Sequence, residues 1–406
     1  SLVGSEMCIR DSVEISQYPD IPNNEFTRDE ILSMLAKEML DAAEQLPASQ
    51  PEVGRIHKYI ALAYAAKIKL YQAYQQDEIT HAVTSINKEL LREVVSLCDQ
   101  VTASNRYGLL DDFQGLDLVT NENGKESVFA IQYSMNDGTE SAGRINWSNL
   151  LNSPGGGSPY GGDGFFLPSQ DLINAYQTDA NGLPDFNYQS KSDYSWAVLN
   201  NGVYTLQNTT PNVDPRLDFV VGRPTITWKT YPDKPCEGWV RDKDTYGYNC
   251  AKRFWVSPES SDMFNGWPWG ASQLNWQIIR YADILLWKAE ALIELNEGNG
   301  LETARDLINQ IRNRARNSAY VKDFNDHSKY AANYLVNPYP ADVWNQDYAR
   351  QALRWETRLE KALEGERFFD LVRWGIVETT MNKYITAESD LSLIHISEPT
   401  RLRCIS

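Results

Sequence analysis

The segment from residue 275 to residue 295, NWQIIRYADILLWKAEALIEL, constrains the fold of this chain more than any other stretch. Its apolar side chains occupy much of the circumference of a helix, so a helix formed here must be buried on several sides. A turn-forming stretch, NEGNG, follows it, and LETARDLINQIRNRA then carries an apolar stripe with helical spacing. The two segments therefore predict a pair of packed antiparallel helices.

Three further helices are predicted in the first third of the chain. FTRDEILSMLAKEMLDAAEQLP has an N-cap at Thr27 with Glu30 three residues later. HKYIALAYAAKIKLYQAYQ offers small side chains such as Ala65 and Ala66, which let neighbouring helices approach closely. INKELLREVVSLCDQVTAS has Cys98 on its apolar stripe, where we expect a small buried thiol. The antiparallel pair predicted over residues 275–315 resembles a tetratricopeptide unit, although no strict 34-residue repeat recurs along the chain.

Residues 105–272 have a different character, because Gly, Pro, Asn, Asp and Ser dominate there. Within them ESVFAIQYS alternates like a strand. SPGGGSPYGGDGF is a loop that lacks the lysine and Ser/Thr of a phosphate-binding loop, which argues against nucleotide binding. The sequence therefore predicts a mostly α protein with a loop-rich, partly β middle, and long structured loops commonly carry function.

These shifts divide the chain into five segments. Residues 13–104 form a helical N-terminal part, residues 105–272 a loop-rich variable region, and residues 273–391 a helical C-terminal region. Residues 1–12 and residues 392–406 resemble translated sequencing-adaptor read-through, so they are interpreted as artefactual extensions and left out of the fold reasoning.

Composition excludes several classes of function. The formal net charge of −17 argues against nucleic acid, whose binding requires a basic face that releases counterions. No run of about eighteen apolar residues occurs, so no helix is predicted to span a bilayer. Between the terminal extensions, His57, His81 and His327 are not paired at metal-ligand spacing, and HExxH, GxSxG and CxxC motifs are absent. We expect no cofactor, no metal and no catalysis, although two carboxylates could still make a glycoside hydrolase.

Aromatic residues are the most informative chemical signal. Seven of the twelve tryptophans fall in the loop-rich region. Flat aromatic faces stack on sugar rings, and amphipathic rings provide contact area at low entropic cost. The alternative is that each ring fills a gap under a long loop. The candidate glycan-binding residues are Trp228, Tyr231, Trp239, Tyr246, Tyr248, Trp255, Trp267 and Trp269.

Two cysteines of the loop-rich region, Cys236 and Cys250, lie in KPCEGWVRDKDTYGYNCAKRF. In an oxidising compartment a disulfide between them would close this loop. Two unpaired thiols are the alternative.

Two charged clusters have structural interpretations. In EGERFFDLVRWG, we expect the side containing Phe368 and Leu371 to pack inward, while Arg367, Asp370 and Arg373 form a ladder of ion pairs. This cluster is then a structural clasp and not an active site. In IRNRARN, the arginines at alternate positions fan around a helix axis, which predicts a solvated face with local ion pairs. They are Arg312, Arg314 and Arg316.

Several segments stand together in an order typical of one family. They are FTRDEILSMLAKEMLDAAEQLP, AYAAKIKLYQAY, KESVFAIQYS, NGLP at 181–184, DPRLDFVVG at 214–222, RYADILLWKAEALIEL, ARDLINQIRNRA and LEGERFFDLVRWG. The chain therefore resembles the SusD/RagB family, nutrient-binding outer-membrane lipoproteins of Bacteroidetes. No single segment decides the resemblance, but the order extends across nearly all of residues 14–390.

The resemblance implies a mostly α, SusD-like fold of tetratricopeptide-like helix pairs carrying a loop-rich ligand face. It implies capture of oligosaccharide or polysaccharide without catalysis, for import through a SusC-like TonB-dependent transporter. It also implies lipid anchoring at the extracellular face of the outer membrane. Members begin with a lipoprotein signal, an anchoring cysteine and further helices, and we expect this chain to start after them. A peptide-binding, RagB-like role in nutrient uptake is the alternative. The ligand face varies within the family, so the resemblance does not assign the aromatic residues.

Overall fold

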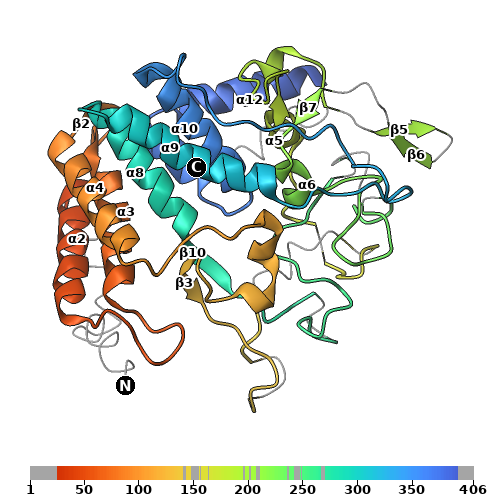
Figure 1. Cartoon of the computed structure of the whole chain (residues 1–406), viewed down its shortest axis with the longest axis horizontal. Coiled ribbons are helices and arrows are strands. Elements are labelled where there is room, and N and C mark those ends of the chain that lie inside the picture. Colours follow the sequence, from red (N-terminus) through yellow and green to blue (C-terminus); the bar gives the residue numbers. More distant parts are fainter. Residues whose placement is uncertain are drawn as a thin grey trace.

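Three helices form one edge of the molecule (Figure 1). The computed structural model describes residues 25–391 except 140–142, 148–154, 156, 163, 195–196, 201–202, 207–210, 236, 242–246, 248 and 267–269. The edge consists of α2 (Arg28–Gln45), α3 (Lys58–Ala73) and α4 (Lys88–Ala103). The three predicted helices are thus confirmed. The Thr27 side chain and the Glu30 side chain form the expected capping box at the start of α2.

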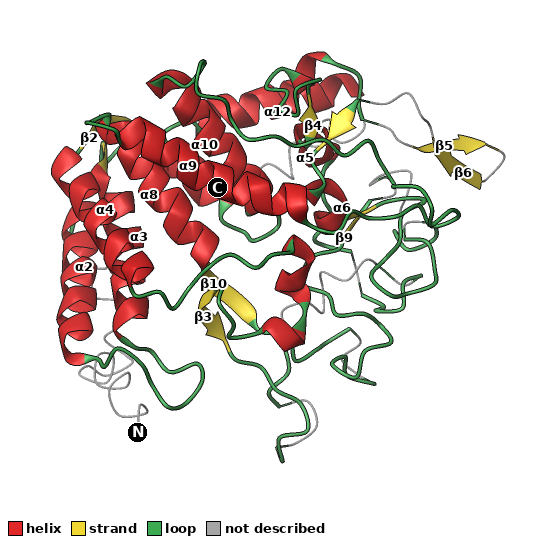
Figure 2. Ribbon diagram, in the orientation of Figure 1, coloured by secondary structure: helices red, strands yellow, loops and turns green. Residues whose placement is uncertain are grey.

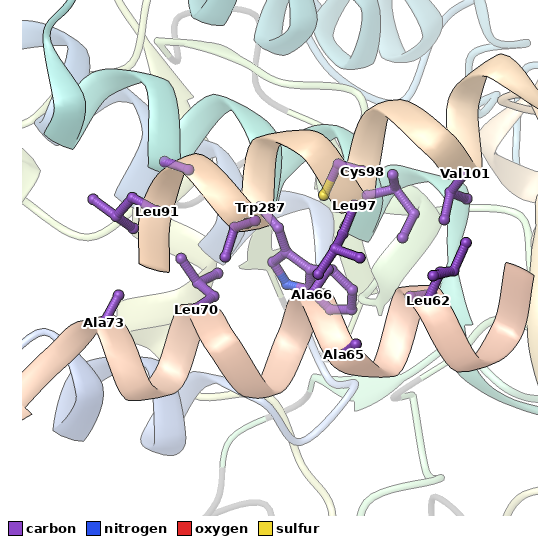
Figure 3. Packing of buried hydrophobic residues seen from close by; sticks show 14 of the residues in the cluster. Leu62, Ala65, Ala66, Leu70, Ala73, Leu91, Leu97, Cys98, Val101 and Trp287 are labelled. Atoms are coloured by element: carbon purple, nitrogen blue, oxygen red, sulfur yellow. The ribbon is translucent and has the colours of Figure 1, made fainter. Parts of the chain in front are cut away.

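Small side chains bring α3 close to α4 and to α8 (Tyr281–Leu295). Ala65 and Ala66 are fully buried in the resulting core, and Trp287 of α8 packs into the same cluster. Figure 3 shows these side chains between the backbones of α3 and α4, with Cys98 among them. Cys98 is the expected buried thiol, and burial raises its pKa to about 12.

The predicted hairpin of helices is present, but its first helix begins later than expected. Residues Trp276–Arg280 form strand β10, which pairs antiparallel with β3 (Ser127–Ile131). The prediction of a helix over the whole of 275–295 was therefore wrong at its start. The pattern WQIIR satisfies a strand as well as a helix, and a partner far away in sequence decides between them. After α8, Asn296 adopts left-handed backbone with φ +51° and lets the chain turn into α9 (Gly300–Asn317).

Helix α10 (Gln346–Glu360) packs against both α8 and α9, and the short α11 (Arg367–Arg373) and α12 (Val377–Leu391) follow it. These C-terminal helices lie beside the first three helices, so both ends of the described chain contribute to one helical body (Figure 1). None of the described helices is long and apolar enough to cross a membrane.

The middle of the chain forms the other side of the molecule and is mostly loop, as predicted (Figure 2). Its described regular elements are short, and each strand among them pairs with only one other strand. The helices are α5 (Gln170–Ala175) and α6 (Arg216–Val220), with 3-10 turns at Phe113–Asp117, Val119–Asn121 and Tyr188–Ser190. The antiparallel pairs are β4 (Gln177–Thr178) with β7 (Asn212–Val213), β5 (Ala197–Asn200) with β6 (Val203–Leu206), and β8 (Val221–Gly222) with β9 (Cys250–Ala251). One further pair, β1 (Tyr74–Gln76) with β2 (Val83–Ile86), connects α3 to α4.

The arginines of α9 do not form a solvated face, and this prediction was wrong. Arg312 and Arg314 are buried, whereas Arg316 is exposed. Arg312 Nη1 lies 3.0 Å from the Glu356 carboxylate of α10, and Arg314 pairs with Glu360 one turn later. Because these carboxylates come from a helix more than forty residues further along the chain, local spacing could not reveal them.

Buried ion pairs extend from α9 into the loop-rich region. Arg216 of α6 lies 2.7 Å from Asp214 and 2.6 Å from Glu356. Arg280, at the start of α8, lies 2.8 Å from Glu126 and 3.0 Å from Glu360. Buried charges are tolerated only when they are paired and hydrogen-bonded. This network therefore fixes Glu126, Asp214 and Arg216 of the loop-rich region against the helical body.

The segment EGERFFDLVRWG is a structural clasp, although its two phenylalanines are exposed. Arg373 pairs with Glu290 of α8 and lies 2.9 Å from Asp370, and the Trp374 indole donates to Glu290 at 2.8 Å. Leu371 is buried as expected, but Phe368 is 49% exposed. The prediction that Phe368 packs inward was therefore wrong, because the seven-residue α11 turns only one narrow face to the core.

Arg367 also departs from the expected ladder of ion pairs. Among the described residues it has no carboxylate partner, and its guanidinium instead lies 5.9 Å from the centre of the Trp374 ring. The ladder is therefore reduced to the pair of Asp370 and Arg373.

Candidate functional site

Three of the candidate glycan-binding tryptophans lie in the core of the loop-rich region. Trp228, Trp239 and Trp255 are at most 2% exposed and form a cluster around Tyr160. The rings of Trp228 and Trp239 meet edge to face at 5.1 Å between centroids, and Tyr160 lies 5.0 Å from Trp255. The Trp228 indole donates to the Tyr160 hydroxyl at 3.0 Å, and that hydroxyl donates to the Val256 carbonyl at 2.6 Å. In this conformation the geometry favours a supporting role for these rings.

Tyr231 lies at the border of this cluster and is partly exposed. Its ring is tilted against that of Trp239 at 6.0 Å, and its backbone N–H donates to the Trp228 carbonyl at 2.8 Å. The other four candidates lie outside the described residues, so that their contact with a ligand stays a prediction. They are Tyr246, Tyr248, Trp267 and Trp269.

The proposed disulfide also involves a residue outside the described part of the chain, namely Cys236. Cys250 is buried in β9, and its thiol donates to the Gly222 carbonyl at 3.5 Å. The absence of a side chain at Gly222 makes room for the Trp228 ring, because a Cβ at this position would lie 2.3 Å from that ring. The pairing of Cys236 with Cys250 stays a prediction.

Other rings of the loop-rich region face solvent. Trp147 is 47% exposed beside the bridge between Asn146 and Ser272, and Phe165 is 75% exposed. Trp147 belongs to the tryptophan-rich region that the sequence identifies, whereas Phe165 follows the glycine-rich loop and was not a candidate. Exposed rings flanked by polar loops are the kind of surface that stacks on a sugar.

A cavity of about 370 Å³ lies between the loop that precedes α3 and strand β3. Its volume is within the range of about 300–1,000 Å³ that is usual for small-molecule sites. The ring of Phe129 closes one side and packs edge to face on Tyr64 of α3, 5.9 Å away. The backbone at Gly54 crosses directly over Gln132 of the opposite wall, since a Cβ there would lie 2.5 Å from the Gln132 side chain.

His57 is the most unusual residue of this cavity. It is 9% exposed, and its Nε2 lies 3.2 Å from the Tyr107 hydroxyl, while Nδ1 has no hydrogen-bond partner in the described part of the chain. Burial, with the positive charge of Arg106 adding to it, lowers the pKa of His57. The imidazole is therefore neutral at pH 7, and its buried Nδ1 is a polar atom without a hydrogen-bond partner among the described residues.

Amide side chains form the far wall of the cavity. Gln132 Nε2 donates to Asn123 Oδ1 at 3.0 Å, and Asn275 Nδ2 donates to Gln132 Oε1 at 3.1 Å. Asn275 in turn accepts from the Tyr133 backbone N–H at 2.7 Å and donates its own N–H to Glu122. Burial raises the pKa of Glu122 to about 7. The amides are thus held in fixed orientations, as a site for hydroxyl groups requires.

The sequence did not identify these cavity residues as a site. They come from three segments, residues 50–60, 106–107 and 123–132, that meet only in the folded chain. Each segment contributes ordinary residues to a helix start, a linker and a strand, so that no local motif marks them. A wide polar groove between Phe186 and α12 is a second concave surface of the described chain. Among the described residues no group of three His, Cys, Asp or Glu is placed to hold a metal ion.

The comparisons with known proteins agree with this architecture. A model of the SusD family matches residues 125–396, more than half of the chain. The chain belongs to the SusD family. The match begins at KESVFAIQYS, so it includes the loop-rich region and the C-terminal helices. No curated protein matches the sequence.

Solved structures of SusD-like proteins share the fold. A SusD-like protein of Bacteroides fragilis is 22% identical with a TM-score of 0.58, and the match covers 90% of this chain and 63% of that one. A SusD-like carbohydrate binding protein of the same species is 21% identical with a TM-score of 0.59, covering 87% of this chain and 60% of that one. A structure described as containing xylogluco-oligosaccharide is 17% identical with a TM-score of 0.55, covering 89% and 60%. The chain thus spans about three fifths of the length of these structures.

Proposed function

We propose that this protein is a non-catalytic glycan-binding protein that captures oligosaccharides for import. The observation that carries the proposal is membership of the SusD family, established over residues 125–396. Two structures of the same fold support a carbohydrate ligand, since one is described as carbohydrate binding and another contains xylogluco-oligosaccharide. The proposed partner is a SusC-like TonB-dependent transporter, and the proposed location is the extracellular face of the outer membrane, through a lipid anchor.

The ligand surface in this proposal is the loop-rich side of the molecule. Trp147, Tyr231 and the four candidate aromatics outside the described residues provide rings for stacking. Trp228, Trp239 and Trp255 hold the loops that carry them, because their rings are enclosed by other residues. The buried ion pairs beneath, which join Arg216 and Arg280 to the helices, keep this surface preorganised before a ligand binds.

Affinity electrophoresis of the chain in gels containing individual plant and microbial polysaccharides tests the proposal. Retardation by at least one polysaccharide, without release of new reducing ends, is the expected result. Retardation accompanied by reducing-end release would identify a glycoside hydrolase and overturn the non-catalytic assignment. Calorimetry against a mixture of peptides tests the alternative of peptide uptake. If the chain binds peptides but no glycan, a peptide-uptake role replaces this proposal.

A further inference from the structure

The cavity beside His57 lies at the positive end of a long helix. Helix α3 has sixteen residues, its first turn contains no acidic side chain, and its N-cap residue His57 makes no capping hydrogen bond through its side chain. The aligned peptide dipoles place a partial positive charge at this end, although the Lys58 N–H already donates to the Pro47 carbonyl and the Ile60 N–H to the His57 carbonyl, each at 3.0 Å. Both His57 and Ile60 of the first turn line the cavity. The cavity therefore favours a negatively charged group.

The side chains around the cavity add to this positive potential. Arg55, Arg106 and Lys125 line it, and Glu52 is the only acidic residue among its lining residues. This local excess of positive charge stands out in a chain whose formal net charge is −17. An anion that approaches the molecule is consequently attracted to this cavity more than to the surrounding surface.

The charges of the cavity are only partly neutralised by protein groups. Arg55 lies 3.4 Å from Glu52, and Lys125 lies 2.9 Å from Asp111, which is 98% exposed. Exposed pairs of this kind contribute little stability, so their cations can turn to a ligand at low cost. Arg106 is exposed, lines the cavity and forms no ion pair with any residue that the structure describes.

His57 lines the cavity, and its buried Nδ1 has no hydrogen-bond partner among the described residues. A polar atom that is buried without a partner costs free energy, and such atoms commonly mark a functional site. The neighbouring amides of Asn123 and Gln132 suit sugar hydroxyl groups, and the rings of Tyr107 and Phe129 suit the apolar face of a sugar.

We propose that this cavity is a subsite for an acidic sugar, and that it receives the carboxylate of a uronic acid residue within an oligosaccharide. The carboxylate binds near Arg106 and the start of α3, while the sugar ring lies between Phe129 and the amide wall. The inference rests on the proposed glycan-binding function and specifies the class of glycan. It predicts that the charge of the ligand, and not only its shape, determines affinity.

Isothermal titration calorimetry on the full chain tests the proposal with two pairs of probes at low salt. Each pair is an oligosaccharide of four uronic acid residues, galacturonate or glucuronate, together with its fully methyl-esterified form. The ester keeps the backbone and removes the charge. At least one acid should bind about tenfold or more tightly than its ester, because hydrogen bonds to an ionised group are the stronger ones.

Variants locate the binding. Arg106→Gln changes an exposed side chain and should abolish most of the preference for the acid over its ester. Arg316→Gln, an equally exposed arginine at the end of α9, is the matched control and should bind like the parent chain. If Arg106→Gln and Lys125→Gln both retain the full preference, the carboxylate binds elsewhere and the proposal is wrong.

Three further outcomes show whether this inference, the proposed function or both are wrong. Equal binding of acid and ester, or binding of neutral polysaccharides alone, would overturn the acidic-sugar subsite and leave glycan capture intact. Tighter binding of a sulfated oligosaccharide than of either acid would assign the charge to sulfate and overturn the uronic acid assignment. If no glycan of the gel panel retards the chain and neither acid binds in the calorimeter, both proposals are overturned.

Discussion

Glu360 is the residue on which the buried ion-pair network can be tested most sharply. Its side chain is fully buried, with Arg216 at 3.2 Å, Arg280 at 3.0 Å and Arg314 closer still. Glu360→Gln keeps the volume and one oxygen acceptor, so that it removes the charge without opening a cavity. Removing one partner of a buried ion pair typically costs about 3–5 kcal/mol, because the remaining charges stay buried without compensation. We expect a loss of that size in the free energy of unfolding.

The assay is urea denaturation at pH 7, followed by the fluorescence of the buried tryptophans. Glu38→Gln, at an exposed position on α2, is the control and should change the free energy of unfolding by no more than about 0.5 kcal/mol. If Glu360→Gln also unfolds within about 0.5 kcal/mol of the parent chain, the network contributes no net stability. The argument that it fixes the loop-rich region would then be refuted.

The pH dependence of stability gives a second view of the same residue. Burial alone would raise the pKa of Glu360, but the positive charges of Arg314, Arg280 and Arg216 outweigh it and lower the pKa from 4.5 to about 2. A carboxylate with a lowered pKa contributes its full stabilisation above pH 4.5 and loses it as the pH falls towards 2. The difference between the two values corresponds to about 3 kcal/mol. Glu360→Gln should therefore show a shallower loss of stability across this range.

Three other tests concern the packing, the aromatic residues and a buried lysine. Ala66→Leu should lower the free energy of unfolding by about 1–3 kcal/mol in the urea assay, because the fully buried Ala66 leaves no space for a larger side chain. Ala103→Leu, at the exposed end of α4, is the control and should be nearly neutral in the same assay. Trp239→Ala should lower the free energy of unfolding by about 3–5 kcal/mol, because this ring is buried. Trp147→Ala should leave the free energy of unfolding unchanged, because this ring is exposed. It should weaken binding of the glycan found in the gel panel by about 1–3 kcal/mol, measured by calorimetry. Burial lowers the pKa of Lys252 from 10.5 to about 7. Between pH 7 and pH 10.5 the unfolded chain therefore binds more protons than the folded chain, and the stability of the folded chain should rise with pH. Lys252→Met should flatten that rise, measured by thermal melts across this pH range.

The helices could be predicted from the sequence because their signals are local. Thr27 and Glu30 mark the start of α2 within four residues, and the stripe through Ile308 and Ile311 defines one side of α9. The glycine-rich and asparagine-rich middle likewise predicts loops without any tertiary information. Family segments such as KESVF and DPRLD were recognised in order, and the structure shows that their charged residues Glu126 and Arg216 belong to the buried ion-pair network.

The parts that escaped prediction depend on partners far apart in the sequence. Residues 276–280 form a strand because β3 lies beside them, and Arg312 is buried because Glu356 is there to pair with it. The same limit applies to the tryptophans: composition indicates that the region is rich in rings, but not which rings are enclosed by their neighbours. Trp239 is covered by Trp228 and Tyr231, which no spacing rule reveals.

A crystal structure of the full chain with the oligosaccharide that binds best in the gel panel is the most direct test of the central claim. The account predicts an uncut oligosaccharide on the loop-rich side, in contact with exposed aromatic rings, with the tryptophan cluster around Tyr160 unchanged beneath it. A cleaved sugar, or an oligosaccharide bound only to the outer helices α2 and α4, would contradict the account.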